Sequence, residues 1–345
     1  MTYYRPIPQT DHARPAVAHA LAGGWCWFDR VECLHRDCAS EVIPASDLPT
    51  DVLDRLTTPR ARIAGLTFNA PTLMGILNVT PDSFSDGGDH FALTDAVTRA
   101  QNMISEGATL IDIGGESTRP GAEKVPTEEE IRRTAPVIEA IRTETATPIS
   151  IDTRKAPVAR AAAESGANLV NDVAGFTFDP ALAPFCAEAD LPVCVMHAQG
   201  TPDVMQKDPR YDNVALDVYD FLSDRIDALT SIGIARNQII VDPGIGFGKT
   251  LDHNLTLLQN LSLFHALGCP ILLGASRKRF IGTIGGSEEA RHRAPGSIAV
   301  AIAGLAQGVQ ILRIHDVRET SEALRLWQAS TLSARILKKN ATEIF

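Results

Sequence analysis

The sequence predicts an α/β fold, a (β/α)8 TIM barrel with a short N-terminal extension. About eight short apolar runs rich in β-branched residues succeed one another between residues 72 and 314, and a longer amphipathic stretch follows each of them. The runs lack the alternation of a half-exposed strand, which is typical of parallel strands covered by helices on both faces. Units of this kind repeated over roughly 265 residues favour a barrel over an open doubly wound sheet.

The predicted strands are short, and several end in a polar residue. They are residues 72–79, 110–114, 148–152, 168–172, 192–196, 238–242, 270–274 and 309–314. The helix after the second strand is expected to begin with Thr127 as its N-cap, because acidic residues follow in the first turn. The helix after the fifth strand is expected to stop at Gly233.

Residues 1–70 do not share this rhythm and are expected to form an extension of unknown role, followed by the barrel over residues 71–340. Residues 60–68 are predicted to be a strand or half a hairpin that closes the N-terminal end of the barrel. So short a leader leaves no room for a second catalytic domain.

Composition and charge restrict the class of function. The chain of 345 residues is 44% hydrophobic, as is ordinary for a globular protein, and its formal net charge is -10. That charge repels nucleic acid and anionic lipid, so an anionic substrate needs a local cluster of cations. No apolar run approaches the roughly 18 residues of a membrane span, and the N-terminus does not resemble a signal peptide. We expect a cytoplasmic protein whose partners are small molecules.

The cysteines are too sparse for a disulfide scaffold and are expected to be reduced. Cys26, Cys33, His35 and Cys38 lie close together in the sequence. Their spacing matches no paired zinc motif, so we favour ordinary thiols over a metal site.

Polar residues gather where the predicted strands end. They are Asn78, Asp112, Asp152, Asn171, Asp172, Asp242, Lys278, Arg313 and His315. In a barrel the carboxyl ends of all strands meet at one mouth, where such enzymes carry their active sites. The sequence therefore predicts one pocket at that mouth.

Two kinds of chemistry are combined in the predicted pocket. Asp152, Asn171 and Asp242 offer hydrogen-bond acceptors suited to a flat heterocycle with amino and amide edges. Donors and positive charge for an anionic group come from Arg119, Lys278, Arg313 and His315.

Each of these residues also has a purely structural interpretation. An aspartate after a strand is often the N-cap of the next helix, and residues 277–279 are equally compatible with a solvated cluster of charges. Lys155 and Arg160 are expected to be surface charges on the helix after the third strand. The histidines at 197, 253, 265 and 292 are expected to be structural or to face solvent.

One glycine-rich segment resembles a nucleotide-binding loop but does not fit the pattern. "GIGFGKT", residues 244–250, has three residues rather than four between its first glycine and the Gly-Lys pair, and Pro243 stands where the glycine is required. It is not a GxGxxG segment either. Nucleotide hydrolysis and dinucleotide binding are therefore not supported.

A series of motifs closely resembles dihydropteroate synthases, enzymes of folate biosynthesis. The motifs are "MGILNVTPDSFSDGG", "DIGGESTRPGA", "SIDT", "NDVAG", "MHAQGTP", "DPGIGFGK", "GASRK" and "LRIHDV". They cover residues 71 to about 320, and the first two are long and specific. The resemblance implies a (β/α)8 barrel, usually a homodimer, that joins p-aminobenzoate to 6-hydroxymethyl-7,8-dihydropterin diphosphate and releases diphosphate with the help of Mg²⁺.

The resemblance also implies roles for individual residues. The pterin edge falls on Asp152, Asn171, Asp242 and Lys278, with Arg313 over the ring, and Asp112 belongs to the same group. The diphosphate and its metal ion fall near Asn78, Arg119, Arg313 and His315, with Asn78 as the metal ligand. The p-aminobenzoate site falls on Phe84, Thr118, Pro120, Phe247 and the stretch after Lys278. Asn78, Arg119, Lys278, Arg313 and His315 are the expected catalytic residues.

The sequence departs from the family pattern at two positions. Ala198 stands where many relatives have methionine, and Arg279 where some place a serine near the aminobenzoate carboxylate. An arginine suits a carboxylate well, so its presence leaves the predicted activity unchanged.

The expected reaction needs no strong general base, because an arylamine is neutral near pH 7. The harder step is departure of diphosphate, so we expect a dissociative substitution in which diphosphate leaves before the amine attacks. Two alternatives remain open from the sequence: a methyltetrahydrofolate-corrinoid methyltransferase and a non-catalytic pterin-binding barrel.

Overall fold

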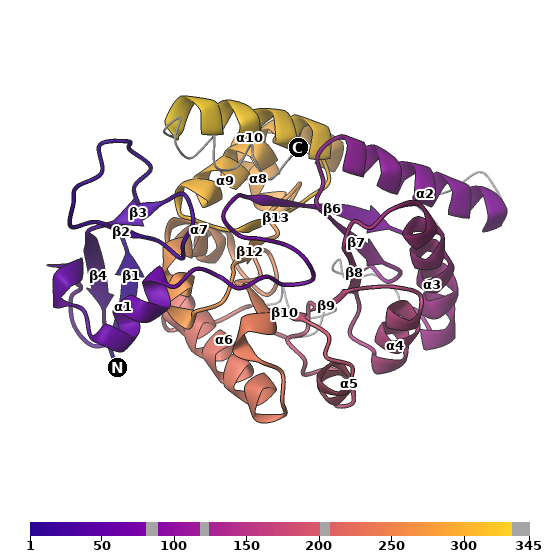
Figure 1. Cartoon of the computed structure of the whole chain (residues 1–345), viewed down its shortest axis with the longest axis horizontal. Helices are drawn as coiled ribbons and strands as arrows, with labels where there is room; N and C mark the ends of the chain where they lie inside the picture. The colour runs from indigo at the N-terminus through magenta and orange to yellow at the C-terminus, as the bar shows by residue number, and fades with distance from the viewer. Residues whose placement is uncertain (81–88, 118–123, 201–207, 333–345) are drawn as a thin grey trace.

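The structure is a computed structural model that describes residues 1–80, 89–117, 124–200 and 208–332. A parallel sheet of eight strands curls into a barrel, and helices cover its outer face (Figure 1). The strands follow one another around the barrel in chain order, and the last, β13, pairs with the first, β6. A bridge between Val241 and Ile271 joins β11 to β12. The predicted (β/α)8 barrel is confirmed.

Each barrel strand lies within its predicted range. The strands are β6 (Thr72–Asn78), β7 (Leu110–Gly114), β8 (Ile149–Asp152), β9 (Leu169–Asp172), β10 (Val193–Met196), β11 (Ile239–Asp242), β12 (Leu272–Leu273) and β13 (Ile311–Ile314). The shortest, β12, was expected to begin at Pro270. Proline has no N–H to donate, so Pro270 contributes only its carbonyl, which accepts from the Val241 N–H at 2.9 Å.

The helices of the outer layer follow the strands along the chain, and α10 comes after the last strand. They are α2 (Asp89–Ser105), α3 (Thr127–Glu144), α4 (Ala156–Glu164), α5 (Leu182–Glu188), α6 (Val214–Ser231), α7 (Leu251–Gln259), α8 (Arg279–Gly285), α9 (Ala294–Ala306) and α10 (Val317–Thr331). Short 3-10 helices are η3 (Arg236–Gln238), η4 (Leu261–Leu267) and η5 (Ala290–Arg293).

Two predicted helix ends can be compared with the structure. Thr127 is the first helical residue of α3 rather than its N-cap. The N-cap is Pro126, whose backbone is extended. The N-cap prediction was wrong because proline, fixed near φ -57°, already supplies the non-helical geometry. Helix α6 ends at Ser231, and Gly233 follows with φ +105°, as the predicted stop requires.

The N-terminal end of the barrel is filled by residues from the segment before β6. Ile63 and Leu66 form an antiparallel bridge, and both side chains are buried together with Phe68. They pack in one cluster with the inward-facing residues of the strands, namely Met74, Leu110, Leu169, Cys194, Ile240, Leu272 and Ile311. Residues 60–68 cover this end of the barrel as predicted, because apolar side chains at strand starts need a cover. They do so with a tight turn closed by one bridge and not with the predicted strand.

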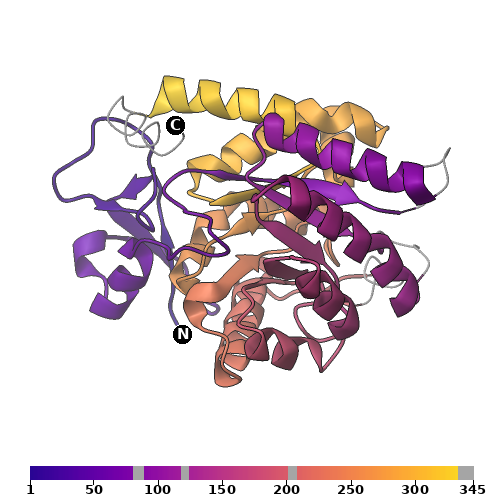
Figure 2. The same cartoon turned by 45° about the vertical axis from the view of Figure 1, so that its right-hand side comes forward.

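The extension forms a small three-stranded antiparallel sheet and a separate two-stranded one, and it lies at one side of the barrel (Figure 2). Its elements are β1 (Tyr3–Pro6), β2 (His19–Ala20), β3 (Trp27–Phe28), β4 (Arg30–Leu34), β5 (Glu41–Pro44), η1 (Ala45–Asp47) and α1 (Thr50–Thr57).

The extension and the barrel share one apolar core and several buried hydrogen bonds. Trp25 Nε1 donates to the Leu305 carbonyl at 2.8 Å, and Ser262 Oγ donates to the Pro6 carbonyl at 2.9 Å. Arg36 forms salt bridges of 2.7 Å with aspartates of α6. The extension is thus built into the fold rather than tethered to it.

Of the cysteines considered as a metal site, Cys26 and Cys33 are buried and Cys38 is exposed, and all are free thiols. Cys26 Sγ donates to the Leu305 carbonyl at 3.5 Å. Among the described residues no group of three or more His, Cys, Asp or Glu side chains is arranged to hold a metal ion. None of the helices in the described ranges is long and apolar enough to cross a membrane.

Candidate active site

The strand ends carry a connected group of polar side chains at the mouth of the barrel. Arg313 on β13 donates from Nε to Asp112 Oδ2 on β7 at 2.5 Å and from Nη2 to Asp152 Oδ2 on β8 at 2.6 Å. Asn171 on β9 donates to the Asp112 carboxylate at 3.4 Å. The structure therefore brings four of the predicted pterin-site residues into one hydrogen-bonded network.

Burial sets the electrostatics of this network. It raises the pKa of Asp152 above its usual range, and Arg313 offsets part of that rise. Burial lowers the pKa of Arg313, but Asp112 and Asp152 more than compensate and raise it overall. The guanidinium is permanently charged. Its positive charge stabilises the two adjacent carboxylates, which are buried away from water.

Asp242 and Lys278 form the second half of the site. Asp242 ends β11, and its Oδ1 accepts from the Gly244 N–H at 2.7 Å. Burial raises the pKa of Asp242, and it lowers the pKa of Lys278 to about 7 although Asp242 acts in the opposite direction. Lys278 therefore titrates near neutral pH.

The side chain of Lys278 lies along the loop that follows β11. Its Nζ donates to the Ile245 carbonyl and lies 4.2 Å from the centroid of the Phe247 ring, a cation–π contact. Gly246 leaves room for the lysine, because a Cβ there would lie 2.9 Å from Lys278 Cδ. Phe247 and Lys278, predicted to serve neighbouring parts of the site, are thus in direct contact.

His315 is held by a serine from the neighbouring strand end. Ser276 Oγ lies 3.0 Å from His315 Nδ1 and accepts from the His315 main-chain N–H at 3.2 Å. The serine hydroxyl thereby helps to fix the orientation of the imidazole ring at the barrel mouth.

The basic run at residues 277–279 divides into three separate roles. Arg277 pairs with Asp316, Lys278 lies against the loop after β11, and Arg279 is exposed as the first residue of α8. The alternative of one solvated cluster is wrong for Arg277 and Lys278, because both have partners within the fold.

Asn78 ends β6 and lies in register with Gly114, which in turn pairs with Asp152. Its side chain is half-buried at the rim. The predicted residues Phe84, Thr118, Arg119 and Pro120 lie outside the described residues, so their placement stays a prediction.

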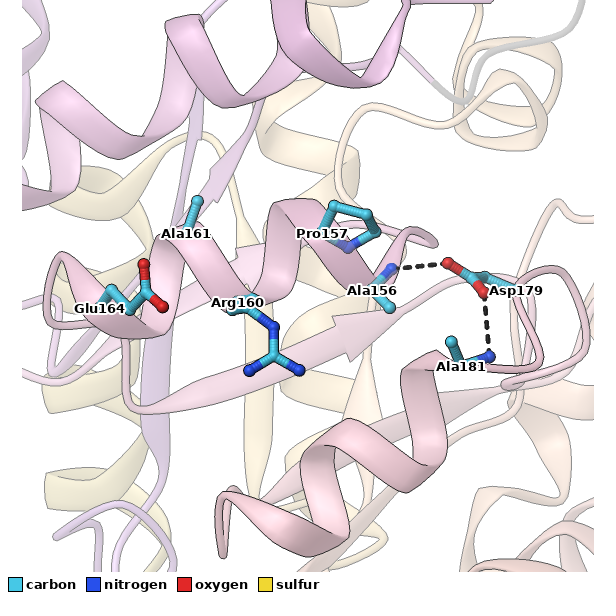
Figure 3. A pocket seen from close by; sticks show the side chains of 7 residues that line it. All are labelled: Ala156, Pro157, Arg160, Ala161, Glu164, Asp179 and Ala181. Carbon is cyan, nitrogen blue, oxygen red and sulfur yellow. Dashed lines mark hydrogen bonds between the residues drawn. The ribbon is translucent and has the colours of Figure 1, made fainter.

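A hollow of about 510 Å³ lies elsewhere, between α4 and α5 (Figure 3). It is lined by Arg160 and Glu164 of α4 and by Asp179, which accepts from the Ala156 and Ala181 N–H groups. Arg160 and Glu164 belong to α4, and Asp179 lies in the loop before α5, seven residues beyond the end of β9. We place the active site at the barrel mouth because the network of buried charged groups is there.

Comparison with known proteins gives the family. Residues 74–315 match the family described as pterin binding enzyme. Dihydropteroate synthase of Escherichia coli is 48% identical over 282 residues, which are 81% of this chain and 98% of that protein. The chain belongs to the dihydropteroate synthases of the pterin-binding enzyme family. The resemblance inferred from the motifs is confirmed.

Solved structures of dihydropteroate synthases from other organisms are similar to this chain in fold and sequence. That of Xanthomonas albilineans with 4-aminobenzoic acid is 46% identical, with a TM-score of 0.73, over 77% of this chain and 96% of that one. That of Yersinia pestis with a sulfonamide drug is 46% identical, with a TM-score of 0.74, over 78% and 98%. The family match begins at residue 74, so the small sheet of the extension lies before it.

Two buried groups near the mouth of this dihydropteroate synthase were missed by the sequence analysis. Lys155, expected at the surface, is buried and pairs with Glu130 at 2.6 Å, whereas Arg160 is exposed as expected. The prediction for Lys155 failed because its partner lies on a different helix, α3. Its position two residues after the Ser-Ile-Asp-Thr motif was the available signal.

The second missed group is the pair of His197 and Lys249, which are in contact at 2.9 Å. His197 was correctly expected to be structural, but its partner was not foreseen. His265 is buried like His197, and His253 and His292 lie nearer the surface. Asp172 has the structural role that the sequence left open as an alternative. Its carboxylate accepts from the Ala174 and Phe176 N–H groups at 2.7 Å and stabilises the turn after β9.

Proposed function

We propose that this chain is a dihydropteroate synthase, a transferase that condenses 6-hydroxymethyl-7,8-dihydropterin diphosphate with p-aminobenzoate to give 7,8-dihydropteroate and diphosphate. One observation carries the proposal: Asp112, Asp152, Asn171 and Arg313, from four different strands, form one network at the barrel mouth. Its carboxylate and amide groups suit the N–H-rich edge of a pterin.

The residues divide the work between holding the ring and releasing the anion. Asp152, Asn171 and Asp242 accept from the amino and amide N–H groups of the ring, and the planar guanidinium of Arg313 stacks on it. Lys278, Arg313 and His315 supply positive charge and donors to the departing diphosphate. In the empty site the carboxylates are paired with the Arg313 cation. Once substrate is bound, they also favour the positive charge that develops on the pterin methylene.

Bond changes follow from this arrangement. The C–O bond between the pterin methylene and diphosphate breaks, and the oxygen keeps the electron pair. The amine nitrogen of p-aminobenzoate then forms the new C–N bond and loses one proton to solvent or diphosphate. No side chain is needed as a strong base, because the arylamine is already neutral.

We propose Mg²⁺ as the metal ion that accompanies diphosphate. The donor set fits this role: Asn78 offers one amide oxygen at the rim, and Mg²⁺ commonly takes one or two protein oxygens together with substrate phosphates and water. When bound, the ion would neutralise charge on the leaving group. Asn78 would hold it, and His315 and Arg313 would hold the diphosphate oxygens.

A diphosphate-release assay tests the function and the order of steps. The purified chain is incubated with dihydropterin diphosphate, with and without p-aminobenzoate, in Mg²⁺ and in excess chelator. We expect dihydropteroate only with both substrates and Mg²⁺. Positional isotope exchange within diphosphate in the absence of amine would support dissociation first. Methyl transfer to cobalamin, or pterin binding without turnover, would instead identify one of the two alternatives.

The quaternary structure and the cellular setting are further parts of the proposal. We propose a cytoplasmic homodimer, in keeping with the family resemblance, and a sulfonamide should compete with p-aminobenzoate, since the Yersinia pestis relative was solved with such a drug. Sedimentation analysis measures the oligomeric state, and a monomer at assay concentration would refute the dimer without affecting the activity.

A further inference from the structure

Lys249 is a buried lysine that the proposed chemistry does not use. It lies between β11 and α7, and only 3% of the residue is exposed. Its Nζ has three acceptors: His197 Nδ1 at 2.9 Å, the Phe247 carbonyl at 3.0 Å and the His197 carbonyl at 3.4 Å. All three acceptors are neutral, so the lysine is a donor of hydrogen bonds rather than half of an ion pair.

His197 is the partner residue, directly after β10. Its ring is buried and meets the Phe221 ring edge-on, with centroids 4.8 Å apart. Burial lowers the pKa of His197 to about 2, and the neighbouring Lys249 acts in the same direction. The imidazole therefore stays neutral, and in the tautomer with the proton on Nε2 its Nδ1 accepts from the lysine.

The loop after β11 lies directly on the main chain after β10. Gly244 has φ +69°, and a Cβ there would lie 1.9 Å from the His197 carbonyl oxygen, so only glycine fits this approach. Tyr211 donates from its hydroxyl to the Gly248 carbonyl at 2.8 Å. Asn254 Oδ1 accepts from the Gly246 N–H at 2.6 Å. Lys249 joins the two loops at the centre of this contact.

The same loop presents two groups to the active site. The Ile245 carbonyl accepts from Lys278 Nζ, and the Phe247 ring packs against that nitrogen. Lys249 donates to the Phe247 carbonyl, so it directly contacts the main chain that carries this ring. Burial of a lysine that has no carboxylate within hydrogen-bond distance costs free energy of folding. Such a residue is therefore better explained by a functional role than by its contribution to packing.

We propose that Lys249 and His197 are positioning residues, which fix the loop after β11 so that Phe247 and the Ile245 carbonyl hold Lys278 and shape the amine-binding side of the site. The inference rests on the proposed function, because it assigns that side to p-aminobenzoate.

Two variants of the full chain test it, namely Lys249→Met and His197→Phe. Methionine keeps the length of the lysine without its donors, and phenylalanine keeps a ring against Phe221 without Nδ1. We expect each variant to raise the KM for p-aminobenzoate about tenfold, because a small misplacement of binding groups has effects of this size, with kcat changed less than about threefold. The double variant should be no worse than either single one, because the two residues act as one unit.

His265→Phe is the matched control. His265 is equally buried, and its Nε2 pairs with the Gln307 carbonyl at 3.0 Å, in η4 next to the extension. This variant should lower the melting temperature without changing either KM.

Unchanged KM values in Lys249→Met and His197→Phe, additive effects, or an equal KM rise in His265→Phe would overturn the inference. If Lys249→Met does not fold, His197→Phe decides by the same criterion. A wild-type chain that forms no dihydropteroate would instead overturn the proposed function together with this inference.

Discussion

Arg313 on β13 donates from Nη2 to Asp152 Oδ2 on β8 at 2.6 Å, and so joins the last strand of the barrel to the third. The same guanidinium donates from Nε to Asp112 on β7, one of the two strands that lie between β8 and β13 in the sheet. One cation therefore serves two buried carboxylates. The site is preorganised for a cationic or N–H-rich ligand, but it depends on this arginine for its stability.

Replacement of Arg313 by methionine should destabilise the fold by about 3 kcal/mol at pH 8, because two buried carboxylates lose their cation. The loss should be smaller at pH 5. The pKa of Asp152 is already raised by burial, and it rises further without Arg313. A carboxyl whose pKa is higher in the folded than in the unfolded chain loses stability as pH rises between those two values.

Urea unfolding at both pH values measures the effect of Arg313→Met. Arg325→Met on the exposed face of α10 serves as the control and should change stability little at either pH. An equal loss at pH 5 and pH 8 would contradict the electrostatic explanation.

Lys278 should give the enzyme an alkaline limit. Burial lowers its pKa to about 7, so the free enzyme loses this cation as pH rises above 7. We expect kcat/KM for the pterin diphosphate to fall up to about tenfold per pH unit above that value. In Lys278→Arg the guanidinium stays charged, so the rate should be lower but nearly constant from pH 7 to 9. If kcat/KM decreased above pH 7 in the same way in the wild type and in Lys278→Arg, the titrating group would be another residue or the substrate.

Ser276→Ala should impair use of the diphosphate without affecting the amine. The hydroxyl is 3.0 Å from His315 Nδ1, and its loss removes a contact that orients the ring. We expect kcat/KM for the pterin diphosphate to fall about tenfold, with an unchanged KM for p-aminobenzoate. Ser262→Ala removes another buried serine, which donates to the Pro6 carbonyl away from the site, so it should change stability alone. Steady-state kinetics with each substrate varied in turn separates the two effects.

The barrel and its mouth could be predicted from the sequence because they follow from local patterns. Continuous apolar runs mark strands covered on both faces, and a polar residue at the end of such a run must lie at the rim. Asp112, Asp152, Asn171 and Arg313 were found in this way.

Pairs made across the fold could not be predicted by the same means. Lys155 precedes α4 in a stretch that reads as a solvated helix start, and nothing local shows that Glu130 of α3 faces it. His197 and Lys249 are likewise 52 positions apart. The sheet of the extension was missed because its strands are short and pair antiparallel, with their cover provided by η4 rather than by their own sequence.

Glu130 is the centre of a buried ionic cluster whose removal should be costly. Its Oε2 accepts from Lys155 at 2.6 Å and its Oε1 from Thr153 at 2.7 Å, and the residue is fully buried. Glu130→Gln leaves the lysine with a weaker partner, so we expect a loss of about 3 kcal/mol in the free energy of unfolding.

The neighbouring Glu129 provides the matched control for Glu130. It forms ion pairs with Arg132 and Arg133 on the accessible face of the same helix, so Glu129→Gln should cost less than about 1 kcal/mol. In Glu130→Gln the buried lysine keeps only Glu116, 3.5 Å away, as an ionic partner. The double variant Glu130→Gln, Lys155→Met should recover part of the loss, because this poorly paired buried charge is then removed. Equal losses in the two glutamine variants, measured by urea unfolding, would show that the cluster contributes no more than a surface ion pair.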